Sequence, residues 1–479
     1  MSKRSFLISA LLLLALRAFH LGPAIDLPHD WRQCDTAYYI WDFFLNGIDL
    51  LHPAVCWMGG HETVALEFPL PEAIVALAYQ LFGESLLLAR LIFLTFFAGA
   101  VYFFYRCIQL LFGQQLAQLS TLAYLVLPLG LFYSRAIHID FSALLFAHAM
   151  LFYYLKSIQT KSYAYLLLSS MLAIPAFLIK APYVFYLALP MLGFVLQQRR
   201  FVWLLKGAIV FAVPVGIFLL WQNHVYQINS AAPDWNYILH YRKFDNNAHW
   251  YFGSFELRLS LYRWWVLLQR GIFEVVGIGG WLFFLWGFWK IKNFWRHSFV
   301  GLWILGLAGY VLIFFNLNVI HNYYQLPLLA PAALIIAYGL QQLQAWKANW
   351  LWPALCLLIG LNVVAAEQQY YQVPDLEIKI GKQIRDHTPA EALVIVSYKK
   401  MDCRNPRILY RARRRGWSIE ELAIKAEVIE RLQQEEGASH WAYIGEEAPA
   451  LLNKAALSSV NFKTIPLNNS KESLFLLQF

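Results

Sequence analysis

Acidic, basic and histidine side chains gather between residues 26 and 70, directly after a first apolar stretch. The segment holds the run 29–36, which reads HDWRQCDT, and closes near Glu67. A carboxylate can take a proton or orient a hydroxyl group, and a guanidinium fork binds phosphate oxygens. Asp35, Arg32 and Gln33 therefore predict a polar site that combines acid–base chemistry with binding of an anionic group.

Three more polar positions follow apolar stretches further along the chain. The run 134–140, SRAIHID, holds Arg135, His138 and Asp140, and Lys180 ends an apolar run just before an Ala-Pro pair. The run 321–327, HNYYQLP, presents a histidine beside two tyrosines. Arginine and lysine are suitable ligands for a phosphate, so these positions extend the candidate site.

Each of these positions also has a purely structural interpretation. Asp35 and Asp140 both precede helix-like segments and could serve as helix caps. Lys180 could extend its ammonium to the membrane surface with no further role, and the 321–324 run could be an aromatic belt.

The spacing of the histidines and carboxylates in the first polar loop does not indicate a metal site. The histidines His29, His52 and His61, together with Asp35 and Glu62, match no compact ligand motif. We expect that no cofactor is required and that no residue is a dedicated metal ligand, and we leave a divalent metal open.

The cysteines also lack a metal-binding pattern. Cys107 and Cys356 lie in apolar stretches and Cys403 lies near the C-terminus. Cys34 and Cys56 share the first polar loop and could form a disulfide if that loop is oxidised.

The elements that carry these residues are membrane spans. Of the 479 residues, 59% are hydrophobic and only 14% are charged, and the mean hydropathy is +0.48, outside the range of a soluble chain. We predict about eleven crossings, each about 20 residues long. Their expected ranges are 5–24, 85–110, 115–134, 141–156, 163–180, 182–197, 202–222, 271–289, 298–315, 326–344 and 349–366.

Lysines and arginines near the ends of these segments predict the orientation. With Lys3 and Arg4 inside, nearly every predicted cytoplasmic turn carries a cation, as the positive-inside rule requires. The N-terminus is then cytoplasmic, and the 26–70 loop, Asp140 and the C-terminal region lie outside. The apolar segment 69–83 is too short for a comfortable span, so we predict a re-entrant or interfacial helix there.

The polar region 367–479 predicts a small extracytoplasmic α/β domain, following a transmembrane catalytic domain at 1–366. Its pattern suggests helices at 376–387 and 418–436 and strands at 392–397 and 440–444. The basic run 411–415 is interpreted as binding anionic headgroups or as a solvated helix face.

These motifs resemble a known family. The run 31–36 after a first span, then Glu67 with Pro69 and Leu70 before an apolar helix, is similar to bacterial relatives of protein O-mannosyltransferases and lipid A aminoarabinose transferases. These are glycosyltransferases of the C-type (GT-C) fold. The runs 134–140 and 321–327 and the Lys-Ala-Pro at 180–182 extend the resemblance over residues 1–366.

The resemblance implies that Asp35 is the main catalytic carboxylate and that Asp140 assists it. It also implies a polyprenyl-phosphate-linked sugar donor, an extracytoplasmic acceptor that is a lipid, a glycan or a protein, and inversion at the anomeric carbon. The substrate-binding residues expected on this basis are Arg32, Gln33, Glu67, Arg135, His138, Lys180, His321 and Tyr324. Two departures from the family are Thr36, where some relatives have a second acid, and Phe68, where the aminoarabinose transferases have a lysine.

Other functions are less well supported by the sequence. A transporter or flippase of a lipid-linked sugar is the second hypothesis, but the halves show no repeat and acids cluster in loops. A membrane-anchored binding protein would need a recognition motif in the tail, and none is evident. The net charge of +9 sets topology, so nucleic acid is not an expected partner, whereas membrane lipids are. Trp57 and Trp235 are the tryptophans expected to contact a sugar.

Overall fold

The structure is a computed structural model of the whole chain. It describes residues 2–61, 63–233, 235, 238, 248–290, 298–398, 401–420, 423–449, 461–467 and 471–479. Two compact units are distinguished by their internal contacts. Unit 1 comprises 1–23, 85–222 and 247–371, and unit 2 comprises 24–84, 223–246 and 372–479.

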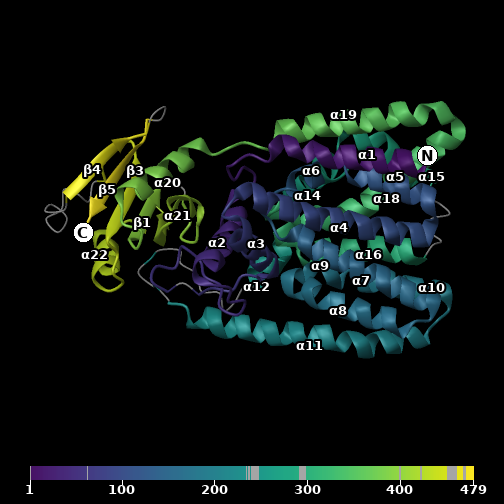
Figure 1. Cartoon of the computed structure of the whole chain (residues 1–479), viewed down its shortest axis with the longest axis horizontal. Coiled ribbons are helices and arrows are strands. Elements are labelled where there is room, and N and C mark those ends of the chain that lie inside the picture. The colour runs from purple at the N-terminus through teal and green to yellow at the C-terminus, as the bar shows by residue number, and fades with distance from the viewer. Residues whose placement is uncertain are drawn as a thin grey trace. The chain divides into compact units, whose positions relative to one another are not determined.

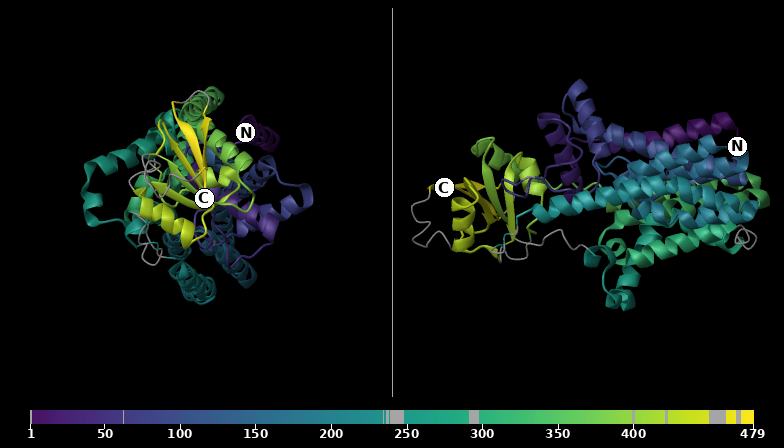
Figure 2. Two further views of the ribbon diagram at one scale, coloured as in Figure 1. Left: turned by 90° about the vertical axis from the view of Figure 1, so that its left-hand side faces the viewer. Right: turned by 90° about the horizontal axis from the view of Figure 1, so that it is seen from below.

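Unit 1 is a bundle of apolar helices that run side by side (Figure 1; Figure 2 gives two further views). Its elements are α1 (Lys3–Ala15), η1 (Leu16–His20), α4 (Leu86–Phe112), α5 (Gln114–Tyr124), α6 (Pro128–Tyr133), α7 (Asp140–Thr160), α8 (Tyr163–Lys180), α9 (Pro182–Phe185), α10 (Ala188–Gln198), α11 (Val202–Ala231, whose last turns belong to unit 2), α12 (Ala248–Phe252), α13 (Phe255–Leu259), α14 (Leu261–Arg270), η2 (Gly271–Val276), η3 (Ile278–Gly280), α15 (Trp281–Lys290), α16 (Ser298–Ile313), α17 (Phe315–Ile320), η5 (Asn322–Leu328), α18 (Leu329–Trp346), η6 (Ala348–Trp350) and α19 (Leu351–Gln369).

Among the described residues, six helices are long and apolar enough to cross a membrane. The bent pair Leu261–Val276 and Ile278–Lys290, with an angle of 77°, makes a seventh if it counts as one span. Nearly all predicted crossings coincide with helices, while the total of about eleven stays a prediction. The crossings predicted at 115–134, 182–197 and 271–289 are each divided between more than one helix. In the first of them, Pro128 begins a new helix and disfavours helical backbone at the residue before it.

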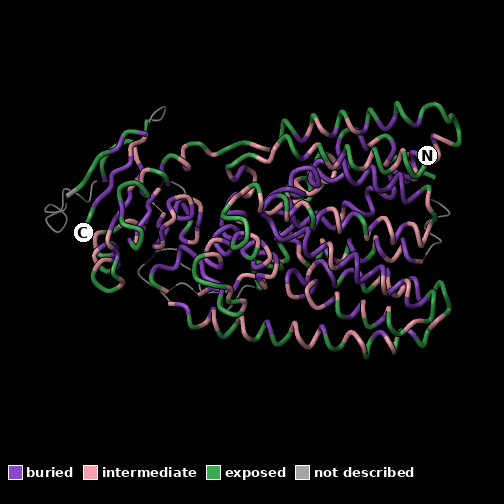
Figure 3. Tube along the Cα trace, viewed as in Figure 1, coloured by how far each residue is buried: buried purple, intermediate pink, exposed green. Residues whose placement is uncertain are grey.

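The helices of unit 1 differ in how much of their surface other helices cover. The tube of α7 and α18 is mostly buried, whereas α11 and α19 are largely exposed or half-buried (Figure 3). Because the exposed positions within 202–220 of α11 and 352–364 of α19 are apolar, in helices long enough to span a bilayer, their surroundings must be lipid. The chain is therefore a multi-pass membrane protein.

Unit 2 combines helices of the first polar loop with a small mixed sheet. Its elements are α2 (Asp30–Asn46), α3 (Leu70–Phe82), α20 (Asp375–His387), β1 (Leu393–Tyr398), α21 (Arg407–Ala412), β2 (Arg415–Glu420), α22 (Ala426–Gln434), β3 (His440–Gly445), β4 (Asn461–Pro466) and β5 (Ser473–Gln478). The strand order is β2-β1-β3-β5-β4, with β1 parallel to β2 and β3 and with β5 antiparallel to β3 and β4. Strand β1 is buried at four consecutive residues, as expected for a parallel strand covered on both faces.

The structure confirms the helix predicted at 376–387 and the strands predicted at 392–397 and 440–444. The helix predicted at 418–436 is wrong at its start, because residues 418–420 belong to β2, and α22 begins only at Ala426. Residues 418–420 fit both the helical period of about 3.6 residues and the strand period of 2. Their pairing with β1 makes them part of a strand. The 69–83 segment is a helix of 13 residues, α3, and its depth in the membrane stays a prediction. The boundary at 366/367 between a catalytic and a soluble domain also stays a prediction.

Candidate functional site

Asp35 lies in the second turn of α2, within unit 2. The helix begins at Asp30, so the interpretation of Asp35 as a helix cap is wrong. The side chain is buried, with 5% of the residue exposed, and its Oδ1 accepts a hydrogen bond of 2.9 Å from Trp57 Nε1. A carboxylate in this setting is held in one orientation by a neutral donor.

Arg32 precedes Asp35 by one helical turn and forms an ion pair with Glu67. Burial raises the pKa of Asp35 to about 7, while the charge of Arg32 and the hydrogen bond from Trp57 act in the opposite direction. A carboxyl group with a pKa near 7 can accept a proton at neutral pH more effectively than one with an ordinary pKa. The arrangement is therefore suited to general-base chemistry.

Gln33 and Trp57 have structural partners within unit 2. The Gln33 amide is buried and donates a hydrogen bond of 2.8 Å to the Asp26 carbonyl. Trp57 is 2% exposed and Trp235 is 3% exposed, with the Trp235 ring at 6.0 Å from that of Trp417. Both tryptophans are buried, and their contact with a sugar stays a prediction, as does the substrate role of Gln33.

Asp140 is the centre of a second buried polar cluster, within unit 1. It is the first residue of α7, and Lys180 is the last residue of α8, so the α7–α8 hairpin brings the two side chains together. Lys180 Nζ lies 2.8 Å from Asp140 Oδ1, and His138 and the Tyr183 hydroxyl also contact this carboxylate. The carboxylate makes no helix-capping hydrogen bond, so the capping interpretation is wrong here too.

Aromatic rings enclose the Lys180 ammonium group. Its Nζ lies 4.7 Å from the ring centroid of Tyr323 and 4.1 Å from that of Tyr324, and the residue is 4% exposed. The interpretation of Lys180 as extending to the membrane surface is therefore wrong. Tyr323 and Tyr324 are buried beside it, which does not fit an aromatic belt, and the His321 ring stacks on Tyr323 at 4.9 Å.

Arg135 is fully buried in unit 1, and its guanidinium carbon lies 5.0 Å from the Phe132 ring and 4.6 Å from the Tyr371 ring. Stacking on two rings holds the guanidinium plane in place. Asp35 belongs to unit 2 and Asp140 to unit 1, so their cooperation stays a prediction, as do the substrate contacts of Arg135, His138, Glu67, His321 and Tyr324.

A buried network around Glu274 was not predicted from the sequence. The Asn322 amide donates to Glu274 Oε2 at 2.6 Å, the Tyr370 hydroxyl donates to the same oxygen at 2.8 Å, and the Tyr133 hydroxyl donates to Asn322 Oδ1 at 2.7 Å. Glu274 lies in the π-helical turn η2, a feature often associated with functional sites. A lone glutamate in a long apolar stretch was the available signal.

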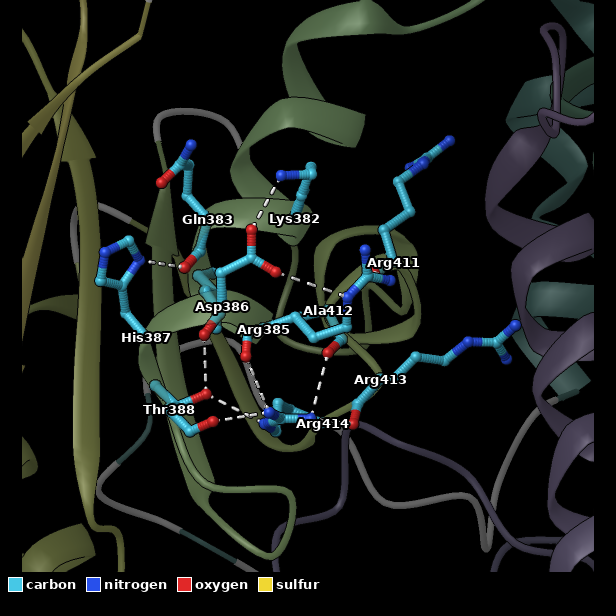
Figure 4. A network of polar contacts seen from close by, with 11 residues as sticks. Lys382, Gln383, Arg385, Asp386, His387, Thr388, Arg411, Ala412, Arg413 and Arg414 are labelled. Carbon is cyan, nitrogen blue, oxygen red and sulfur yellow. Dashed lines mark hydrogen bonds and ion pairs between the residues drawn. The ribbon is translucent and has the colours of Figure 1, made fainter.

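The basic run 411–415 is not a solvated face. Arg411 is 7% exposed at its side chain and pairs with Asp30 at 2.8 Å and with Glu377 at 2.7 Å. Arg414 donates to Thr388 Oγ1 at 2.9 Å and to the carbonyls of Thr388 and Arg385 (Figure 4). These two arginines hold α2, α20 and α21 together, so the headgroup interpretation is wrong for them.

Arg411→Gln is expected to lower the free energy of unfolding by about 2 kcal/mol, because Asp30 and Glu377 each lose one charge-assisted hydrogen bond and keep Arg407 as a cationic partner. The measurement is the thermal unfolding of the purified full-length protein. Lys382→Gln is the matched control, since the exposed Lys382–Asp386 pair should contribute only about 0.5 kcal/mol. Equal shifts for the two variants would contradict a structural role of Arg411.

The thiols of Cys34 and Cys56 are both free and buried, so the predicted disulfide option is wrong. Burial raises the pKa of both thiols well above the usual range, which keeps them protonated and unreactive. Among the residues that the structure describes, no three histidine, cysteine, aspartate or glutamate side chains gather as metal ligands. Glu62, one of the residues considered for a metal, lies outside the described ranges.

Together, the apolar helices and the small mixed sheet define a polytopic membrane protein, and comparison with solved structures shows that its fold is GT-C-like. The chain is similar to ArnT from Cupriavidus metallidurans in the apo state, with a TM-score of 0.63 and 13% identity over 99% of this chain and 97% of that chain. ArnT bound to undecaprenyl phosphate matches with a TM-score of 0.63 and 14% identity, over 98% and 97% of the two chains.

Two further comparisons agree with this fold. The Archaeoglobus fulgidus oligosaccharyltransferase matches with a TM-score of 0.59 and 13% identity, over 91% of this chain and 67% of that chain. Residues 67–226 match the profile of the family described as dolichyl-phosphate-mannose-protein mannosyltransferase. Comparison with curated proteins finds no matching relative. The predicted fold class, with its resemblance to these glycosyltransferases, is confirmed.

Proposed function

We propose that this protein is a membrane glycosyltransferase that moves a sugar from a polyprenyl-phosphate carrier to an extracytoplasmic acceptor. The observation that carries the proposal is the buried Asp35, with its pKa raised to about 7, in a chain that has the ArnT-like fold. The undecaprenyl phosphate in one ArnT structure and the dolichol phosphate in one archaeal oligosaccharyltransferase structure support a carrier of this class.

In the proposed reaction, the acceptor hydroxyl attacks the anomeric carbon of the sugar. A carbon–oxygen bond to the acceptor forms, the bond to the carrier phosphate breaks, and the acceptor proton passes to Asp35. Polyprenyl phosphate leaves as an anion, and a single displacement inverts the anomeric configuration. Arg32, which lies one turn before Asp35, would offset the negative charge that develops on the leaving phosphate of the carrier.

Roles in binding the donor are assigned to unit 1 residues on chemical grounds. Lys180 and Arg135 carry the charges that suit a phosphate, and His321 and Tyr324 would complete the donor site. Asp140 would orient Lys180, and His138 would hold the same carboxylate. Glu67 and Gln33 would fix the positions of Arg32 and of the start of α2.

The proposed location is the bacterial inner membrane, with the N-terminus cytoplasmic and unit 2 extracytoplasmic. Nucleotide sugars do not reach that side, which favours a lipid-linked donor. The acceptor is a lipid, a glycan or a protein, and the reaction is proposed to need no bound cofactor. Assays with EDTA and with added Mg²⁺ or Mn²⁺ test this proposal, and a loss of activity with EDTA that added metal restores would contradict it.

The test is release of free polyprenyl phosphate by the purified protein from a panel of polyprenyl-phosphate monosaccharides, with crude envelope material as acceptor. We expect release from one donor, together with sugar transferred in equal amount. No release from any donor would contradict the proposal. Movement of the intact donor between membrane leaflets, without release, would instead favour a transporter.

A further inference from the structure

A cavity of about 700 Å³ opens at one end of the unit 1 helices, between the ends of α7, α8, α10 and α11. Four of its lining residues are cations, namely Lys161, Arg199, Arg200 and Lys206. All nine residues that line it are described in the structure, and none of these is acidic. Two of the others, Tyr163 and Trp203, are aromatic.

The cavity lies at the opposite end of the bundle from the Asp140–Lys180 pair. Helix α7 runs from Asp140 to Thr160, directly before Lys161, and α8 returns from Tyr163 to Lys180 (Figure 1). At about 1.5 Å per residue, twenty residues span about 30 Å, the thickness of a hydrocarbon core. The cavity is therefore at the other membrane surface and is separate from the proposed donor site.

Topology accounts for cations in these turns, and four of them also line this one cavity. Lys161 and Arg199 each end a helix in the left-handed conformation, with φ of 56° and 54°, and Lys206 comes from the next helix. Lys206 Nζ lies 4.5 Å from the Tyr163 ring and 5.1 Å from the Trp203 ring. Arg200 donates to the Ile158 carbonyl at 2.7 Å and Lys206 donates to the Tyr163 hydroxyl, so both have neutral partners, and a bound anion would lower the repulsion among the four cations.

An apolar surface continues from the cavity along two neighbouring helices. On α11, Val202, Leu205 and Ile209 are 65%, 65% and 64% exposed, at helical spacing. On α8, Leu167 and Met171 are 55% and 66% exposed and follow Tyr163 at intervals of four residues. The two helices are in contact, because Ser170 Oγ donates to the Val210 carbonyl at 2.8 Å. Such an apolar surface can contact acyl chains, whereas it offers no ligand to a free ion.

We propose that the cavity binds the phosphate headgroup of an anionic membrane phospholipid, whose acyl chains lie along α8 and α11. Basic pockets between helices at a membrane surface are suited to such headgroups, and tyrosine and tryptophan favour the same depth. Inorganic phosphate has the same anionic chemistry but no chains. The proposal goes beyond the transfer reaction and does not depend on it.

The test is native mass spectrometry of the full-length protein with phosphatidylglycerol, with phosphatidylcholine of the same acyl chains, and with inorganic phosphate. We expect phosphatidylglycerol to bind at least about tenfold more tightly than either of the others. Equal binding of the two lipids would overturn the proposal. Binding of inorganic phosphate as tight as that of phosphatidylglycerol would show a free-anion site instead and would also overturn it.

The variant for this test is Lys206→Gln with Arg199→Gln, which removes two charges from the cavity. We expect phosphatidylglycerol affinity to fall about tenfold or more, since each cation contributes about a fivefold effect. The matched control, Lys290→Gln with Lys347→Gln, removes two exposed charges away from the cavity and should change affinity less than twofold. Equal losses in both variants would overturn the site. If the double variant does not fold, Lys206→Gln alone should show about a fivefold loss.

Discussion

Asp35→Asn is expected to lower the rate of sugar transfer about a thousandfold, while the protein stays folded. The asparagine side-chain oxygen can still accept the hydrogen bond from Trp57 Nε1, so the local packing is preserved. What is lost is the group that accepts the acceptor's proton, and general-base catalysis contributes about 10²–10⁴-fold. The measurement is polyprenyl phosphate release at equal amounts of folded protein.

Asp42→Asn is the matched control for this variant. Asp42 lies two turns further along the same helix, is 8% exposed, and accepts a hydrogen bond of 2.7 Å from Asn46. Its neutralisation should change the rate less than about threefold. A similar loss in both variants would indicate damage to α2, and normal activity of Asp35→Asn would remove Asp35 from the proposed reaction.

The same carboxyl group predicts how activity depends on pH. Burial raises its pKa to about 7, and only the ionised form can act as a base. We expect kcat/KM to fall about tenfold per pH unit below pH 7 and to level off above it. This slope should be absent from the residual activity of Asp35→Asn.

Stability should change in the opposite sense to activity. The pKa of Asp35 is raised from 3.8 in the unfolded chain to about 7, so the folded state holds the proton more tightly, and ionisation destabilises it as pH rises. Asp35→Asn removes that cost. Its melting temperature should match or exceed that of the wild type at pH 8, with a smaller difference at pH 5. A purely structural Asp35 would give a less stable variant at both pH values.

The sequence predicted well those elements whose signal is local. Long apolar runs gave the helices, and the run 392–397 gave strand β1, because burial on both faces requires continuous apolar residues. The α7–α8 hairpin also follows from the sequence, since a short turn at Lys161 makes the two helices antiparallel neighbours. Lys180 and Asp140 are therefore brought together by features that can be predicted.

Features that depend on distant pairing could not be predicted. Arg411 contacts Asp30 across 381 positions of sequence, and no local pattern distinguishes such an arginine from one on a solvated face. The hydrogen bond from Trp57 to Asp35 likewise depends on how the first polar loop folds back on α2. A short run such as 418–420 fits a helix or a strand, and only its pairing with β1 decides.

Lys180→Met is expected to lower the free energy of unfolding by about 3–5 kcal/mol, because it leaves the Asp140 carboxylate buried without its cation. His138 and Tyr183 would still contact the carboxylate but cannot supply the same fixed charge. Activity should fall about a hundredfold if Lys180 also binds the donor phosphate. Thermal unfolding and donor-dependent release measure the two effects separately.

A double variant distinguishes these two roles. Asp140→Asn combined with Lys180→Met removes both buried charges and should recover most of the lost stability, since replacing both partners avoids an uncompensated charge. Activity should not recover, because the phosphate ligand is still missing. Lys156→Met is the control: its Nζ lies over the Tyr165 ring at 4.1 Å near the far end of α7, so its loss should cost about 1 kcal/mol or less. Recovery of both stability and activity in the double variant would show that Lys180 serves only to neutralise Asp140.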